Sequence, residues 1–371
     1  MARIVDAGSE ILSAVREAHS LSRRDLLQAV PAVATFGATL LGAGAAAAAP
    51  AKDEKQLNLA ASPPAGFVPF AAPGRVVKVE KPGSLQANQL YPKPEDAKAM
   101  LTKALMEFTG EPDLVKAVGR FVHKDDRVCV KLNGIAKENM GTNKELVIPF
   151  LEALIAAGVP AQNITVLEQY RNFLQGTRVS DRNVPAGVKT AVHLNEDATM
   201  PERMIQGTGV RTKFVRVLTE ATAVINFSLV KDHSICGYTG AMKNMTHGCT
   251  INPHDFHVHH ASPQIALLYA QDVIKSRVRL HITDAFKVMA HGGPLWKQPQ
   301  YVSSYESIFV ATDPVAMDTL GWEIVEARRA EKKLRSLTKE GREPAYLKAA
   351  ADLGLGVYER AQIKLQEFKL S

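Results

Sequence analysis

The chain has 371 residues, three cysteines and a formal net charge of +7 at pH 7. It contains no Cys-x-x-Cys sequence, which argues against a ferredoxin-type iron–sulfur cluster. It also lacks G-x-G-x-x-G, Walker and Gly-x-Ser-x-Gly sequences, so we expect no NAD or ATP and no serine hydrolase of the usual α/β type.

Residues 1–49 have the pattern of a twin-arginine export signal. Arg23 and Arg24 precede a weakly apolar run of Ala and Gly, which ends in small residues before Pro50. Leu26 replaces the usual aromatic residue after the pair. A transmembrane anchor is the alternative, but this run is too weakly apolar to hold a span. We therefore predict that the twin-arginine machinery exports the chain to the periplasm or elsewhere outside the cytoplasm.

The signal carries four basic and four acidic residues, so the mature chain of about 320 residues keeps the whole excess of positive charge. In an exported protein this excess does not indicate a nucleic-acid partner. It is compatible with a small anionic substrate, with anionic membrane or wall surfaces, or with surface solubility alone.

Residues 50–74 are rich in Ala and Pro and predict a tether or a surface-hugging arm. Residues 75–371 predict a single domain in which strands alternate with helices. The predicted strands are Arg75–Lys81, Arg127–Leu132, Asn163–Glu168, Val188–Leu194, Ala221–Val230, Val278–Thr283, Ser304–Ala311 and Gln362–Leu370. The predicted helices are Pro94–Phe108, Pro112–Val122, Lys144–Ala157, Ser262–Lys275, Pro314–Leu334 and Ala345–Leu353. This alternation predicts an α/β fold: a doubly wound, mainly parallel sheet with helices on both faces and sites at the carboxyl ends of strands.

Two of these strand ends carry lysine beside other polar groups. Lys131 and Asn133 are two residues apart and project to one side, so we assign both to substrate binding, although an ordinary strand exit has the same pattern. A second strand runs into Lys231 and His233. A lysine beside an imidazole lowers the pKa of the histidine and can bind an oxyanion, so we predict that both are catalytic.

A glycine-rich turn follows, and then a predicted helix with Thr239 near its N-cap. Lys243 and His247 are four residues apart, which puts them on one face of this helix. The free N–H groups at its start favour an anion. We assign Lys243 and Asn244 to substrate binding.

Residues 247–260 hold five of the eleven histidines, one cysteine and one aspartate. Imidazole and thiolate are standard ligands of transition metals, so this segment predicts a metal ion of unknown identity. Proline residues make it an ordered loop that leads into a helix. The candidate ligands are His247, His257, His259 and Cys249. In an oxidising compartment, Cys249 can instead pair with Cys236.

Two aspartates complete the predicted site. Asp284 follows the strand Val278–Thr283, a preferred position for a catalytic base, and we assign it that role. Asp313 is explained by helix capping next to Pro314. Asp318 lies one turn further along the helix, on a face that can look toward the strand ends, and we assign it to substrate binding.

Several of these motifs occur in an order that resembles a known bacterial family. They are Lys131-Leu132-Asn133, Ile225–Gly248, Ile282-Thr283-Asp284, Thr312–Asp318 and Leu353-Gly354-Leu355-Gly356. Over roughly residues 125–357 the chain resembles the domain of unknown function 362, in its twin-arginine-exported branch. The resemblance implies an α/β fold with a polar pocket, and it implies no particular reaction. Some relatives carry iron–sulfur domains, but their cysteine motifs are missing here.

Together these patterns predict an exported metal-dependent enzyme, in one version linked to a redox partner, that acts on a small anionic molecule. Lys231 and Lys243 hold the anion, and His233 or Asp284 is the general base. One alternative is a non-catalytic periplasmic protein that binds a metal or an anion. The other is an accessory protein whose histidines are interface or core groups.

Overall fold

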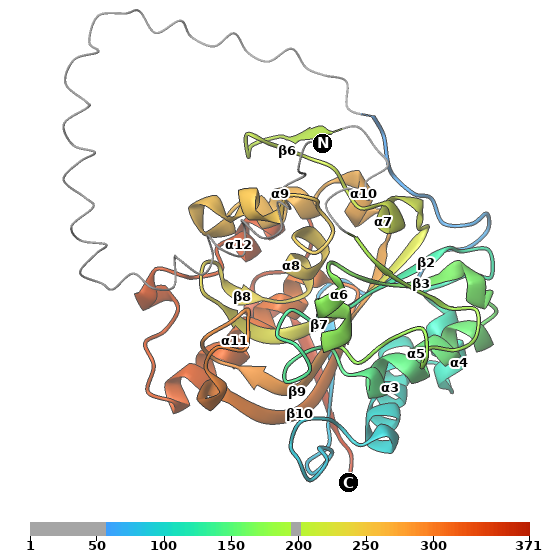
Figure 1. The fold of residues 1–371 in the computed structure, drawn as a ribbon, viewed down its shortest axis with the longest axis horizontal. Coiled ribbons are helices and arrows are strands. Elements are labelled where there is room, and N and C mark those ends of the chain that lie inside the picture. Colours follow the sequence, from blue (N-terminus) through green and yellow to red (C-terminus); the bar gives the residue numbers. More distant parts are fainter. Residues whose placement is uncertain (1–56, 194–201) are drawn as a thin grey trace, which may run out of the picture. The chain divides into compact units, whose positions relative to one another are not determined.

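The computed structural model describes residues 57–193 and 202–371, so the predicted export signal lies outside the described residues. A nine-stranded sheet dominates this part of the chain, in the order β11-β1-β10-β9-β7-β2-β3-β4, with β8 paired to β7 (Figure 1). Its strands are β1 (Arg75–Glu80), β2 (Val128–Lys131), β3 (Ile164–Glu168), β4 (Lys189–Val192), β7 (Ala223–His233), β8 (Gly237–Thr239), β9 (Val278–Met289), β10 (Val302–Ala311) and β11 (Lys364–Lys369). A separate hairpin pairs β5 (Arg203–Ile205) with β6 (Val210–Thr212).

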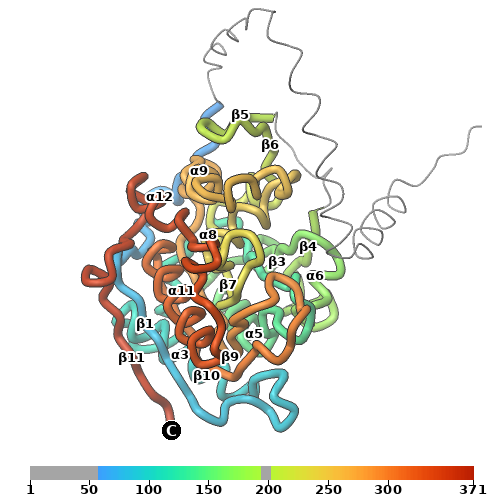
Figure 2. The backbone as a smooth tube through the Cα atoms, turned by 90° about the vertical axis from the view of Figure 1, so that its left-hand side faces the viewer, coloured from blue at the N-terminus to red at the C-terminus, as the bar shows by residue number. Residues whose placement is uncertain are grey.

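The strands of the main sheet are mostly parallel. β9, β7, β2, β3 and β4 pair in parallel, and β1 pairs in parallel with β11. β10 lies between β1 and β9 and is antiparallel to both. Figure 2 shows β1 and β11 side by side, although they come from opposite ends of the described chain. The predicted α/β fold with a mainly parallel sheet is confirmed.

Helices cover both faces of this sheet (Figure 1). They are α3 (Pro94–Thr109), α4 (Leu114–Gly119), α5 (Lys144–Ala156), α6 (Arg171–Gly176), α7 (Arg216–Glu220), α8 (Ala241–Thr246), α9 (Gln264–Tyr269), α10 (Asp272–Lys275), α11 (Pro314–Glu331) and α12 (Tyr346–Asp352). Alternating side chains of β7 divide between the two layers: Ile225 and Phe227 join the core under α3, α4 and α5, whereas Val224 joins the core under α8, α9 and α11. No helix in the described ranges is long and apolar enough to cross a membrane.

The Ala/Pro-rich segment behaves as an arm where the structure describes it. The backbone N–H of Leu59 donates to Asp272 Oδ2 at 2.6 Å, and that of Ala61 donates to Ser276 Oγ at 2.9 Å. Further along, Phe70 packs edge-on against Phe108, with ring centroids 5.5 Å apart. Residues 57–74 therefore lie along the domain.

Two strands extend beyond their predicted ends. β7 continues through Lys231 to His233 because these residues pair with β8, Lys231 opposite Thr239 and His233 opposite Gly237. β9 continues to Met289 because it pairs with β10. The predicted helix over 262–275 is two short helices, α9 and α10. Elements of three to six residues, such as β5, β6, β8, α6 and α7, were not predicted, because hydrophobic periodicity needs a longer window.

We expect Gly240→Ala to destabilise the domain. An added Cβ would lie 2.2 Å from Asp318 Oδ1 and 2.4 Å from a ring carbon of Tyr238. Overpacking of this kind costs roughly 1–3 kcal/mol, measurable by urea unfolding. Gly119→Ala in α4 is the control, because its nearest neighbour is 4.0 Å away. Equal stability of the two variants would contradict the tight packing described here.

Candidate functional site

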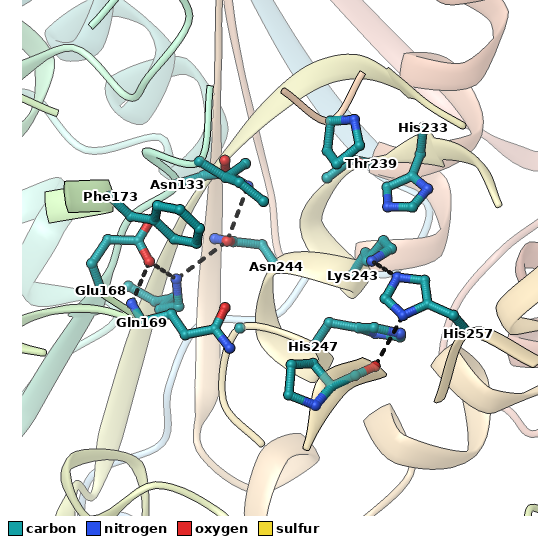
Figure 3. A pocket seen from close by; sticks show the side chains of 15 residues that line it. Asn133, Glu168, Gln169, Phe173, His233, Thr239, Lys243, Asn244, His247 and His257 are labelled. Carbon is teal, nitrogen blue, oxygen red and sulfur yellow. Dashed lines mark hydrogen bonds and ion pairs between the residues drawn. The ribbon is translucent and has the colours of Figure 1, made fainter. Parts of the chain in front are cut away.

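A pocket of about 190 Å³ lies where β2, β3 and β7 end (Figure 3). Lys131 is the last residue of β2 and Asn133 follows it, Glu168 is the last residue of β3, and His233 ends β7. The carboxyl ends of parallel strands meet at one edge of a sheet, which explains why residues so distant in sequence share one pocket. The helix α8 and the segment Pro253–Ala261 close the other side.

Glu168 is the only carboxylate among the described residues that line the pocket, and it is fully engaged. Its Oε2 accepts from Lys131 Nζ at 2.9 Å and from the backbone N–H of Gln169 at 2.6 Å. Its Oε1 accepts from the backbone N–H of Gly134 at 2.5 Å. Lys131 and Glu168 therefore neutralise each other.

Two asparagine side chains connect this ion pair to the interior of the sheet. Asn244 Oδ1 accepts from Asn133 Nδ2 at 3.2 Å, and Asn244 Nδ2 donates to Asn226 Oδ1 at 2.7 Å and to the carbonyl of Phe227 at 3.0 Å. Asn226 Nδ2 continues the network to His281 Nδ1 at 3.0 Å. These contacts fix the orientation of both amides, so Asn133 presents its Oδ1 away from Asn244.

That oxygen accepts a hydrogen bond from Lys231 Nζ at 2.7 Å. Lys231 is fully buried and lies behind the pocket lining. Burial lowers the pKa of Lys231 to about 7, with the positive charges of Lys243 and Lys131 adding to the effect and Glu168 opposing it.

Three imidazoles and one lysine form the opposite wall (Figure 3). Lys243 Nζ donates to His257 Nε2 at 3.1 Å, and His257 Nδ1 donates to the carbonyl of Pro253 at 3.0 Å. The ring of His257 lies 4.6 Å from that of His247 and 5.4 Å from that of His233, centroid to centroid.

All three imidazoles are neutral near pH 7. Burial, reinforced by Lys243, lowers the pKa of His257 to about 4 and holds the pKa values of His233 and His247 well below their usual range. Burial also lowers the pKa of Lys243. Within the described ranges no carboxylate forms an ion pair with Lys243, so a protonated Lys243 carries the unbalanced positive charge of this wall.

The hydrogen positions on two of these rings follow from their neighbours. His233 Nδ1 accepts from the backbone N–H groups of Ile235 at 3.1 Å and Cys236 at 3.4 Å, so in the neutral ring the proton is on Nε2. The hydroxyl of Thr246 donates to the carbonyl of Lys243 at 3.3 Å and therefore accepts from His247 Nδ1 at 3.2 Å. His247 Nε2 is left with a lone pair, and it has no partner among the described residues.

Asp232 and two distant arginines hold the end of β7 in place. Arg342 Nη1 donates to Asp232 Oδ1 at 2.8 Å and to the carbonyl of His233 at 2.7 Å. Arg329, fully buried, lies 3.8 Å from the same carboxylate oxygen. These contacts fix the backbone from which His233 projects.

The assignment of Asp318 to substrate binding needs correction. Its Oδ1 accepts from the backbone N–H of Ala241 at 2.6 Å and its Oδ2 from that of Met242 at 2.9 Å. The start of α8 is therefore occupied by a carboxylate of the chain itself, and the anion site predicted there is wrong. Gly240 is the N-cap residue of α8, and Thr239, predicted near the N-cap, directly precedes it as the last residue of β8.

Asp284 also has a different position from the one predicted. It is buried within β9 and does not line the pocket. Its Oδ2 accepts from the backbone N–H of Asn143 at 2.8 Å and from Asn143 Nδ2 at 2.9 Å. Asp284 thus anchors the residue that precedes α5, and the structure gives no support for its role as general base.

Of the four predicted metal ligands, the structure brings only His247 and His257 together. His259 is exposed, at a φ of 51° in a turn that leaves the pocket, and Cys249 is buried outside the pocket lining. Burial raises the pKa of the Cys249 thiol to about 12, which disfavours the thiolate that binds metals. In residues 57–193 and 202–371, no three His, Cys, Asp or Glu side chains are grouped so that they could hold a metal ion. All three cysteines are free.

Several residues of the pocket were not predicted. Glu168 ends a predicted strand and Gln169 follows it, so the reasoning that identified Lys131 would also have found them. The sequence predicts Thr239 only near the start of a helix, and its place in the pocket lining was not expected. Arg329 and Arg342 lie outside the pocket lining and were not predicted either. They are remote in sequence from β7, and nothing in the local pattern indicates Asp232 as their partner.

Comparison with known proteins adds a family but no activity. The model of a family described as domain of unknown function (DUF362) matches residues 128–323, more than half of the chain. No curated protein matches the sequence.

Two solved structures resemble this one weakly. The first is a protein from Thermotoga maritima, 14% identical, with a TM-score of 0.37 over 66% of this chain and 60% of that one. The second is the lactate racemase apoprotein from Thermoanaerobacterium thermosaccharolyticum, 10% identical, with a TM-score of 0.33 over 67% of this chain and 57% of that one. The matched part thus spans less than two thirds of either protein, and at these scores neither informs the function.

We expect Lys231→Met to change how stability depends on pH. The folded-state pKa of about 7 lies below the unfolded value, so protonated Lys231 destabilises the fold fully below pH 7, and the penalty fades as pH rises toward 10.5. The difference in free energy of unfolding between the variant and the parent chain should be larger at pH 6 than at pH 9, in favour of the variant, by on the order of 2 kcal/mol. Urea unfolding at both pH values measures this difference. The control is Lys98→Met on α3, which replaces an exposed lysine. A pH-independent difference for Lys231→Met would contradict the buried, perturbed amine.

Proposed function

We propose an activity from the pocket alone, because this chain belongs to a family described as domain of unknown function (DUF362), and that description names no reaction. The protein is an enzyme that acts on a small anionic molecule by proton transfer. The observation that carries the proposal is Lys243. This lysine is only 6% exposed, faces the pocket and has no carboxylate partner among the described residues. A buried cation without a counter-ion is costly, and an anionic ligand would remove that cost.

Two imidazoles supply the proton-transfer chemistry. His247 Nε2 has a free lone pair and is the proposed base, while His233 Nε2–H is the proposed acid. Burial lowers the pKa of both imidazoles, and the nearby positive charge of Lys243 lowers it further. A bound anion would offset that charge and raise both pKa values toward the working pH, so that the catalytic groups are tuned only when substrate is present.

The metal-dependent and redox-linked versions of this function stay predictions. His247 Nε2 and His257 Nε2 are the two nitrogens that could bind a metal, and His257 would first have to give up its hydrogen bond with Lys243. Two imidazoles do not complete a tetrahedral site, so we derive no step through a metal. Export by the twin-arginine route also stays a prediction, since its signal lies outside the described residues.

We expect the protein to catalyse exchange of carbon-bound hydrogen for deuterium in at least one member of a panel of small carboxylic acids in D₂O. Nuclear magnetic resonance of the acids measures this exchange. Lys243→Gln should lower kcat/KM by about a hundredfold or more, because it removes the charge that holds the anion. Lys98→Gln is the matched control and should have no effect.

Elemental analysis of the same exported preparations tests the metal separately. Stoichiometric metal that is lost in His247→Ala would support a metal-dependent enzyme. Anion binding without exchange or other turnover would instead favour the non-catalytic binding protein. If neither binding nor turnover responded to Lys243→Gln, the proposed site would be wrong.

A further inference from the structure

We propose that the ligand of this pocket is a small monocarboxylate that also carries a hydroxyl group. The inference rests on the proposed function, because it names the substrate class of the same site. Three groups on one wall of the pocket support it. Lys243 is a cation without a counter-ion, His233 Nε2–H is a fixed hydrogen-bond donor, and the buried His247 Nε2 can only accept a hydrogen bond.

Buried polar atoms without partners gather at this pocket. In the described chain, Gln169 Nε2, Thr239 Oγ1 and His247 Nε2 are buried and lack a hydrogen-bond partner, and all three residues line it. The large majority of buried side-chain polar atoms in folded proteins have a hydrogen-bond partner. Three such atoms around one cavity therefore indicate that a polar ligand completes their hydrogen bonds.

The charge of the lining selects the anion. Lys131 and Glu168 cancel each other, which leaves the single positive charge of Lys243 facing the pocket. A carboxylate carries one negative charge and matches this count, whereas a phosphate dianion exceeds it. The N–H on His233 Nε2 and the amide of Gln169 are further donors for the carboxylate oxygens.

The free nitrogen of His247 selects the second group of the ligand. Its partner must donate a hydrogen, because Nδ1 already carries the ring proton. A hydroxyl can do so without adding charge. A protonated amine is disfavoured, since the positive charge of Lys243 would repel it.

The test compares glycolate with three probes that each differ from it in one feature, and with one unrelated anion. Acetate lacks the hydroxyl, glycolamide lacks the charge, and glycine replaces the hydroxyl with an ammonium. Inorganic phosphate tests the other anion class. We expect the full chain to bind glycolate roughly tenfold more tightly than each of the others, as titration followed by NMR or thermal shift would measure.

Two variants assign the preference to His247. His247→Phe keeps a ring but removes the acceptor, so glycolate should bind no better than acetate. Thr246→Val leaves the imidazole in place and removes the hydroxyl that orients it, and it should reduce the same preference. This second variant keeps the inference testable if His247→Phe fails to fold.

The outcomes separate this inference from the proposed function. Equal binding of glycolate and acetate by the parent chain would overturn the hydroxyl, and tighter binding of phosphate would overturn the carboxylate. If deuterium exchange required Lys243 but no hydroxycarboxylate bound, this inference alone would fail. Selective binding of glycolate with no turnover of any acid would leave the inference standing and defeat the enzymatic proposal.

Discussion

The pocket depends on one interaction, the two hydrogen bonds from the first turn of α8 to the carboxylate of Asp318. A helix of six residues is not stable by itself, because too few hydrogen bonds repay the cost of nucleation. Asp318 satisfies two of its free N–H groups from α11, and Gly240 leaves the space for that approach. Since α8 carries Lys243 and Asn244 and ends just before His247, the position of one carboxylate sets half of the pocket.

The chemistry of the pocket comes from an uneven distribution of charge. On one wall, Lys131 and Glu168 neutralise each other and the asparagines share their amide hydrogen bonds. On the other, a single lysine faces three imidazoles, whose pKa values are lowered first by burial and further by the charge of that lysine. Removal from water strengthens each of these effects, because the local dielectric constant is lower than that of solvent. Any change in the charge beside Lys243 therefore changes the pKa values of the three imidazoles.

The sequence predicted much of this arrangement because parallel strands follow a strong rule. Lys131, Asn133 and His233 follow or end apolar strands, and such strand ends converge whatever the connections between them. Lys243 and His247 were placed on one face by helical spacing. The same rule gave the wrong position for Asp284. β9 continues past this residue to pair with β10, so Asp284 lies inside a strand and not at its end. His259 failed because local density of histidine says nothing about a turn that carries the chain away from the pocket.

Asp318 shows a different limit of sequence reasoning. Its partner is a helix start 77 residues earlier in the chain, and local pattern contains no information about which buried N–H groups need an acceptor. The same holds for Arg329 and Arg342, whose partner Asp232 is known only once the chain has folded. Long-range polar contacts of this kind are set by tertiary packing, and a single sequence does not specify them.

The position of Arg342 has a practical consequence for expression of shorter pieces. The family match ends at residue 323, yet Arg342 donates the hydrogen bonds that hold Asp232 and His233, the last two residues of β7. The outer strands β1 and β11 also lie beyond the matched boundaries. A fragment trimmed to residues 128–323 would lose both hydrogen bonds from Arg342 and both outer strands, so it would not hold His233 as the longer chain does.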